Sequence, residues 1–120
     1  VPVRLHPADA SRAGLAGARP LADGEEIRFG GAALRVIHTP GHTPGSVCFL
    51  GGGCLFSGDT LFPGGPGATD GPAAFARVMV ALRERLFVLP DDTVVLPGHG
   101  PATSLGAERP YLDDWERRGW

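Results

Sequence analysis

Residues 38–50 read HTPGHTPGSVCFL, a loop rich in turn residues that leads directly into an apolar run. Its two Pro-Gly pairs predict tight turns. Residues 46–50 are typical of a β-strand, and the apolar run at 47–50 predicts that this strand is buried on both faces. Residues 33–39 also predict a strand, so His42 lies in a loop between two strands. A rigid sheet can hold a polar side chain in place in such a loop.

Two further loops have the same design. Residues 56–62 read FSGDTLF and carry Asp59 just after an apolar strand, while residues 95–103 read VLPGHGPAT and carry His99 in the same position. A glycine next to each polar residue allows the backbone to approach a bound group closely.

Two imidazoles and one carboxylate are a sensible set of ligands for zinc or iron, and a carboxylate can bridge two ions. Such an ion lowers the pKa of a bound water to about 7 and so supplies hydroxide at neutral pH. No two of the three residues lie within a few positions of each other, as ligands on one helix do. Spacing alone therefore does not separate a metal site from three ordinary polar turns.

The rest of the chain predicts a sheet covered by helices, an α+β organisation. An irregular Gly/Pro-rich loop is expected at 63–72. Expected strands are 1–5, 26–29, 33–39, 46–50, 54–57 and 93–96, and expected helices are 8–17, one that begins near Pro72 with an apolar stripe at Phe75, Val78, Met79, Leu82 and Leu86, and 108–118.

Composition excludes several classes of protein. The 120 residues suffice for one domain, the net charge is −2, and all eleven basic residues are Arg with no basic run, so no nucleic-acid partner is expected. No apolar stretch approaches the ~20 residues of a membrane span. Cys48 and Cys54 flank a hairpin; a disulfide is geometrically possible, and the alternative is two small apolar residues of a reduced cytoplasmic protein.

The three motifs together, HTPGHTPGSVCFL, FSGDTLF and VLPGHGPAT, resemble the metallo-β-lactamase superfamily and, more narrowly, its glyoxalase II-like branch. The resemblance covers the chain from Val1 to Trp120. It implies a four-layer αβ/βα sandwich with two facing sheets. This chain is expected to supply the C-terminal half of that sandwich, as a partial domain with a mostly antiparallel sheet and covering helices.

The resemblance also implies roles for individual residues. His42 is the expected ligand of one metal, His99 that of the second, and Asp59 bridges both ions at the catalytic centre. His38 and His6 are expected to be structural, with His38 near the site in packing or hydrogen bonding. Thr43 and Ser46 are expected to hold their turn, and Thr60 either orients the neighbouring carboxylate or has no such part.

The family's main signature, HxHxDH, is absent from the sequence. Val1 corresponds to the point where the family sequence resumes after that motif, so the chain is expected to be a fragment. Two zinc ions are implied for an intact site, but each would keep only two ligands here, and a metal normally needs at least three. We therefore expect weak or absent zinc binding by the chain alone. The inner face of its sheet is expected to be apolar and to be covered by the missing N-terminal segment or by a second copy of the chain.

For the intact protein, the resemblance implies a zinc hydrolase of thioesters or related small acyl compounds. An iron enzyme resembling the persulfide dioxygenases and a lactonase are alternatives within the same fold. A further alternative is a truncated or self-associating module without activity.

Overall fold

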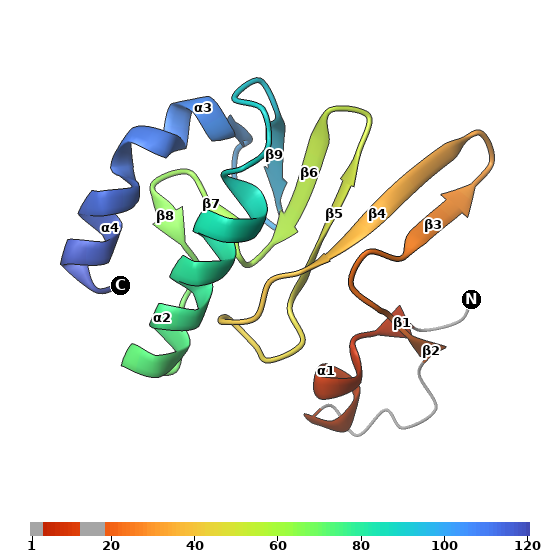
Figure 1. Cartoon of the computed structure of the whole chain (residues 1–120), viewed down its shortest axis with the longest axis horizontal. Helices are drawn as coiled ribbons and strands as arrows, with labels where there is room; N and C mark the ends of the chain where they lie inside the picture. Colours follow the sequence, from red (N-terminus) through yellow and green to blue (C-terminus); the bar gives the residue numbers. More distant parts are fainter. Residues whose placement is uncertain (1–3, 13–18) are drawn as a thin grey trace.

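A six-stranded sheet forms the centre of the computed structural model, which describes residues 4–12 and 19–120 (Figure 1). Its strand order is β10-β9-β6-β5-β4-β3, and every neighbouring pair is antiparallel except β6 and β9. The strands are β3 (Glu26–Phe29), β4 (Ala32–His38), β5 (Val47–Gly51), β6 (Cys54–Gly58), β9 (Val94–Pro97) and β10 (Thr103–Ser104). The expected α+β class with a mostly antiparallel sheet is confirmed.

Two tight hairpins build four of these strands. The turn between β3 and β4 contains Gly30 and Gly31, and the turn between β5 and β6 contains Gly52 and Gly53. Gly52 and Gly53 both have positive φ angles, 59° and 76°, which L-residues with a side chain rarely adopt. The predicted strand pairs around glycines are therefore confirmed.

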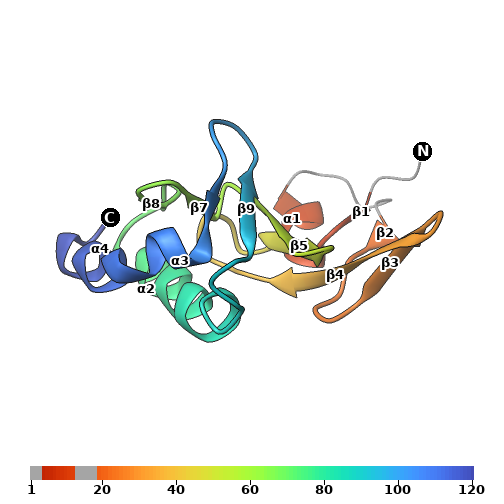
Figure 2. The ribbon, with the colours of Figure 1, turned by 90° about the horizontal axis from the view of Figure 1, so that it is seen from above.

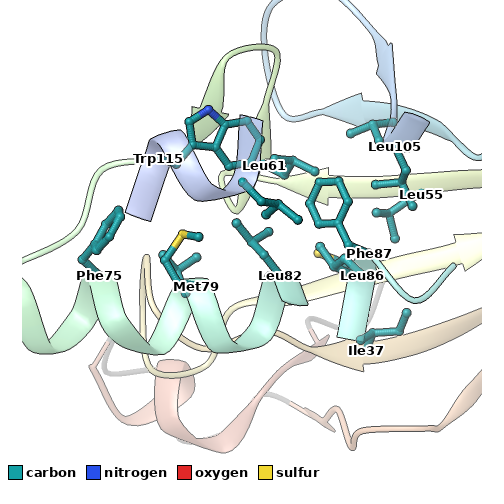
Figure 3. Packing of buried hydrophobic residues seen from close by; sticks show 14 residues of the cluster. Ile37, Leu55, Leu61, Phe75, Met79, Leu82, Leu86, Phe87, Leu105 and Trp115 are labelled. Atoms are coloured by element: carbon teal, nitrogen blue, oxygen red, sulfur yellow. The ribbon is translucent and has the colours of Figure 1, made fainter. Parts of the chain in front are cut away.

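One face of the sheet is covered by α2 (Pro72–Ala81) and the single π-helical turn η1 (Leu82–Leu86) that continues it. The predicted apolar stripe points into the core: Figure 3 shows Phe75, Met79 and Leu82 on the side of the helix that faces Leu61 and Trp115, and Leu86 belongs to the same buried cluster. Because the side chains of the stripe recur with helical periodicity, the helix buries one side and leaves the other in water. The core residues are Ile37, Cys48, Leu55, Leu61, Phe75, Val78, Met79, Leu82, Leu86, Phe87, Val95, Leu105, Leu112 and Trp115.

The opposite face of the sheet is only partly covered. Phe56 and Val94 on this face are each 40% exposed, and α1 (Pro7–Arg12) lies on this side, away from α2 (Figure 2). The prediction that strand 46–50 is buried on both faces is wrong, because only Cys48 is buried and its neighbours 47, 49 and 50 are half-buried. Within residues 4–12 and 19–120, the helices that contribute to the buried core lie on one face of the sheet.

The end of the chain differs from the predicted helix at 108–118. Helical structure begins three residues earlier, with α3 (Leu105–Glu108), and continues through the 3₁₀ turn η2 (Arg109–Tyr111) into α4 (Leu112–Arg118). The Ser104 hydroxyl accepts a hydrogen bond from Ala107 N–H and caps the first of these helices. Pro110, which has no N–H to donate, lies at the break between them.

The loop at 63–72 is not wholly irregular as predicted. Its Gly65–Pro66 segment, β8, pairs with β7 (Leu61–Phe62) in a short antiparallel hairpin. Proline is tolerated here because the pair is only two residues long and does not continue into the main sheet.

The first residues are described in part. The strand predicted at 1–5 is present at Arg4–Leu5 as β1, which pairs in parallel with β2 (Arg19–Pro20), and the helix predicted at 8–17 is α1; positions 1–3 and 13–18 lie outside the described residues. Among the helices of residues 4–12 and 19–120, none combines the length and the apolar character that crossing a bilayer requires.

Shortening a side chain of the apolar helix stripe should destabilise the fold. Leu82 is fully buried between the helix and the sheet, so Leu82→Ala is expected to lower the free energy of unfolding by about 2–5 kcal/mol. Val80, on the other side of the same helix, is 53% exposed, and Val80→Ala should change it by less than about 0.5 kcal/mol. Urea denaturation of the two variants measures the difference; equal effects would contradict the packing described.

The two cysteines should differ in reactivity. Both are free thiols, and burial raises the pKa of Cys48 to about 11, with hydrogen bonds from Thr39 and Thr60 acting in the opposite direction. The thiolate is the reactive species, so iodoacetamide at pH ~8 should label half-exposed Cys54 in the native chain and Cys48 only after unfolding. Peptide mass spectrometry measures this, and equal labelling in the native state would be inconsistent with the structure.

Candidate metal centre

Asp59 is held in a turn at the end of β6. Thr60 N–H donates to the Ser57 carbonyl at 2.9 Å and closes the turn around the aspartate. From the neighbouring strand end, Gly98 N–H donates to the Gly58 carbonyl at 2.8 Å. The parallel pairing of β6 with β9 therefore brings the loop of Asp59 next to the loop that carries His99.

The backbone of Gly67 passes directly behind this turn. A Cβ atom at position 67 would lie 1.9 Å from the Asp59 carbonyl oxygen, closer than any real contact between these atoms. Gly67 N–H donates to the Thr60 carbonyl at 3.3 Å. A residue without a side chain is required at this point, a requirement that no sequence motif indicated.

The loop of His42 is closed at its base by Thr39 N–H, which donates to the Ser46 carbonyl at 2.8 Å. Within the loop, Thr43 N–H donates to the Ser46 hydroxyl at 3.0 Å, and the hydroxyls of these two residues are 2.9 Å apart. The predicted part of Thr43 and Ser46 in holding the turn is confirmed. Gly41 lies against α2, where a Cβ atom would be 2.5 Å from that of Val78.

A carboxylate from α1 braces the same loop from the other side of the sheet. Asp9 accepts hydrogen bonds from the Thr43 hydroxyl at 2.7 Å and from Gly45 N–H at 2.9 Å. Bonds to an ionised acceptor are stronger than neutral ones. The loop that carries His42 is therefore fixed by both the sheet and a helix that precedes it by about thirty positions.

A backbone carbonyl orients the imidazole of His42. Its Nδ1 lies 2.6 Å from the Ala68 carbonyl oxygen. Because a carbonyl oxygen can only accept, Nδ1 is the donor of this hydrogen bond. Nε2 of the same ring faces Oδ2 of Asp59 at 3.4 Å. Metal-binding histidines commonly have their second ring nitrogen bonded in this way.

His99 approaches the other oxygen of the same carboxylate. Its Nδ1 is 3.5 Å from Oδ1 of Asp59, and its ring lies 4.7 Å from the ring of Phe62, tilted by 46°. The side chain is 78% exposed. The three residues singled out in the sequence thus come together from three different loops, with Asp59 in the middle.

These separations suit metal ligation. Two ligands at about 2.1 Å from one ion in tetrahedral geometry lie about 3.4 Å from each other, close to the 3.4 and 3.5 Å between each imidazole and its carboxylate oxygen. Residues 4–12 and 19–120 contain no group of three or more His, Cys, Asp or Glu side chains arranged to hold one ion. Each imidazole and its carboxylate oxygen therefore have the spacing of two ligands of one ion, and the described residues do not add a third to either pair.

Buried hydroxyl groups lie next to the site. The Thr39 hydroxyl is 3.3 Å from that of Thr60 and 3.4 Å from the Cys48 thiol, and both threonines are at most 1% exposed. The Thr60 hydroxyl thus bonds to Thr39 and not to the carboxylate of Asp59. It joins the two loops below the site, so Thr60 acts on the position of the turn and not on the carboxylate directly.

His38 and His6 have the structural parts expected of them. His38 Nε2 lies 2.9 Å from the Pro44 carbonyl, and the two imidazoles stack at 4.1 Å with an angle of 10° between their planes. Burial and the nearby His38 lower the pKa of His6, with Asp9 acting in the opposite direction.

Three further groups that position the loops of the site were not predicted from the sequence: Asp9, the Ala68 carbonyl and Glu108. Glu108 is 7% exposed and accepts bonds from Gly64 N–H at 2.9 Å and from the Thr103 hydroxyl at 2.7 Å. It therefore connects the turn of the β7–β8 hairpin to β10. A backbone carbonyl has no sequence signature. A single acidic residue in a short helix, such as Asp9 or Glu108, cannot be told from a solvated one by sequence alone.

A sequence comparison matches residues 7–99 to the family described as "Metallo-beta-lactamase superfamily". Hydroxyacylglutathione hydrolase GloC of Haemophilus influenzae is 36% identical over 97 residues, which cover 76% of this chain and 46% of the relative. The chain spans about half the length of the curated relatives it matches.

Solved structures share the fold. ETHE1 from Myxococcus xanthus superposes with a TM-score of 0.73 at 35% identity, over 79% of this chain and 44% of the other. TTHA1623 in a di-iron-bound form superposes with a TM-score of 0.68 at 41% identity, over 91% of this chain and 62% of the other.

A side chain at position 67 should displace the turn of Asp59. Gly67→Ala places a Cβ against the Asp59 carbonyl, and the backbone shift needed to relieve the clash should cost about 1–3 kcal/mol of folding free energy. The measurement is urea denaturation combined with NMR shifts of residues 58–60.

Gly31→Ala is the matched control. A Cβ atom there meets nothing within 4 Å, and the residue has no positive φ, so this variant should stay within about 0.5 kcal/mol of the parent. Unchanged shifts at 58–60 in Gly67→Ala would contradict the close approach of the two backbones.

Proposed function

The chain belongs to the metallo-beta-lactamase superfamily, and on that premise we propose that His42, Asp59 and His99 are metal ligands of a metal-dependent hydrolase. The observation that carries the proposal is the position of Asp59, with an imidazole nitrogen 3.4 Å from one carboxylate oxygen and another 3.5 Å from the second. A carboxylate presented in this way can bridge two ions.

When bound, divalent ions in such a centre supply a hydroxide nucleophile at neutral pH and stabilise the negative charge that develops on the attacked carbonyl. Asp59 presents Oδ2 to His42 and Oδ1 to His99, so its carboxylate lies between the two imidazoles. The Ala68 carbonyl accepts a hydrogen bond from Nδ1 of His42 and so turns Nε2 toward Asp59, where it could bind an ion. The chain's own contribution is thus a set of donors that the loops at the strand ends hold in place.

This set is incomplete on its own, because each ion would have two protein ligands where at least three are usual. We propose that an HxHxDH segment, which would precede these residues in an intact protein, supplies the rest. The same segment, or a second copy of the chain, would cover the sheet face on which Phe56 and Val94 are 40% exposed. The chain by itself would then be without activity.

A thioester or a related small acyl compound is the proposed substrate of the intact protein. The 36% identity to a hydroxyacylglutathione hydrolase supports this class. Hydroxide attack on a thioester carbonyl releases a carboxylic acid and a thiol, which is chemistry that such a centre can perform.

Iron in place of zinc is the second candidate. It is favoured by the 41% identity to TTHA1623, whose structure holds two iron ions, and the likeness to ETHE1 supports a reaction of the persulfide dioxygenase type. The ligand types alone do not discriminate, because imidazole and carboxylate suit both metals.

The 120-residue chain should bind zinc weakly, with a dissociation constant above about 1 μM by calorimetry. A protein that also carries an upstream HxHxDH segment should bind two equivalents of metal and hydrolyse a thioester. Its Asp59→Asn variant should lose at least about 100-fold in kcat/KM, because a neutral amide is a poor bridging ligand. Elemental analysis of that protein distinguishes zinc from iron.

Thr69→Ser is the control for this experiment, since it changes one methyl group in the loop behind His42 and should leave kcat/KM within about threefold of the parent. Stoichiometric sub-micromolar zinc binding by the 120-residue chain would contradict the incomplete site. Full activity in Asp59→Asn would contradict the proposed ligand set.

A further inference from the structure

A pocket lies between the end of β4 and the helix formed by α2 and η1, and none of His42, Asp59 and His99 lines it. Its volume is about 390 Å³, within the range of small-molecule sites, and its lining is almost wholly apolar. One wall is formed by His38, the last residue of β4, and by Pro40, which follows that strand. The other wall is formed by α2 and η1. The helix contributes Ala76, Arg77, Val80, Ala81 and Arg85.

The helix sequence explains why a hollow forms here. The inner side of the helix carries the large residues Phe75, Met79 and Leu82, as Figure 3 shows. The side turned toward β4 carries Ala76 and Ala81, which leave space that a larger side chain would fill. Val80 lies at the edge of that space and is 53% exposed, so it offers apolar surface to a molecule in the pocket.

Two arginines, Arg77 and Arg85, line the pocket, and they differ in whether a carboxylate pairs with them. Arg85 donates to Asp23 Oδ1 at 2.5 Å, and Asp23 also accepts a hydrogen bond from His38 N–H at 2.9 Å. These two bonds outweigh the effect of burial and lower the pKa of Asp23. Arg85 is therefore neutralised by a carboxylate that stays ionised.

Arg77 is different, because in the part of the chain that the structure describes it has no hydrogen bond or ion pair. It lies eight positions before Arg85, or about 12 Å along the helix. Nε2 of His38, which also lines the pocket, is hydrogen-bonded to the Pro44 carbonyl and not to Arg77. The pocket thus combines an apolar floor with one uncompensated guanidinium at one end.

We propose that this pocket binds a small carboxylic acid with an unbranched apolar body, its carboxylate on Arg77 and its chain along Ala76, Val80 and Pro40. Guanidinium groups recognise carboxylates through two parallel hydrogen bonds. The apolar floor removes the hydrocarbon from water, which supplies the larger part of the affinity. The proposal does not depend on the metal centre, since none of the proposed ligands lines this pocket.

The test is an NMR titration of the ¹⁵N-labelled 120-residue chain with butanoate, hexanoate and octanoate. Shifts should be confined to residues 38–40 and 76–85 and should saturate with octanoate at a dissociation constant on the order of 1 mM. Each added CH₂ group should tighten binding about fourfold. Octylammonium, which has the same chain and the opposite charge, should give no saturable shift there.

Two variants and one control complete the experiment. Arg77→Gln should weaken octanoate binding at least about fivefold, and Val80→Ser should weaken it about as much by removing part of the apolar floor. Both positions are exposed, so both variants should fold. Arg117→Gln, an exposed arginine on α4, should bind as the parent does.

Equal binding of octanoate and octylammonium would overturn the proposal, because the pocket would then be a purely apolar surface suited to another protein segment. Absence of shifts at residues 38–40 and 76–85, or unchanged binding in Arg77→Gln, would overturn it as well. Shifts centred on residues 42, 59 and 99 would place the carboxylate at the metal centre instead and likewise contradict it.

Discussion

The carboxylate of Asp59 stands between two imidazoles, and the arrangement of the rest of the chain follows from that constraint. His42 and His99 come from loops 57 positions apart in sequence, and each must reach a different oxygen of one side chain. This is possible because β6 lies next to β9 on one side and β5 on the other. Backbone bonds between the loops, such as Gly98 N–H to the Gly58 carbonyl, then leave little freedom.

The sheet and its core were largely predictable because their signals are local. Alternation and glycine turns indicate the two hairpins, and helical periodicity indicates which side of α2 is buried. The predicted burial of strand 46–50 failed for a physical reason: an apolar run shows that a strand can be covered on both faces, but not that the described chain supplies both covers. The bounds of the last predicted helix, 108–118, also differed, because periodicity does not locate helix ends. Helical structure begins at Leu105 and is interrupted by the 3₁₀ turn that contains Pro110.

The candidate site was predictable only as far as its ionisable side chains. His42, Asp59 and His99 were found from their motifs, and the structure brings them together. The groups that set their geometry left no trace in the sequence: the Ala68 carbonyl, the close pass of Gly67 behind the turn, and Asp9 on a distant helix. These are long-range contacts, and their partners are defined by topology and not by spacing.

In the proposed function, His42, Asp59 and His99 form one half of a metal centre, and Asp59 is shared between two ions. Titration of the 120-residue chain with Co²⁺, followed by NMR of the four histidine rings, tests it most directly because the paramagnetic ion broadens only nearby resonances. We expect the resonances of His42 and His99 to broaden together and those of His6 and His38 to stay sharp. Asp59→Asn should abolish the broadening. Broadening of His6 and His38, or of His42 and His99 regardless of the Asp59 substitution, would contradict it.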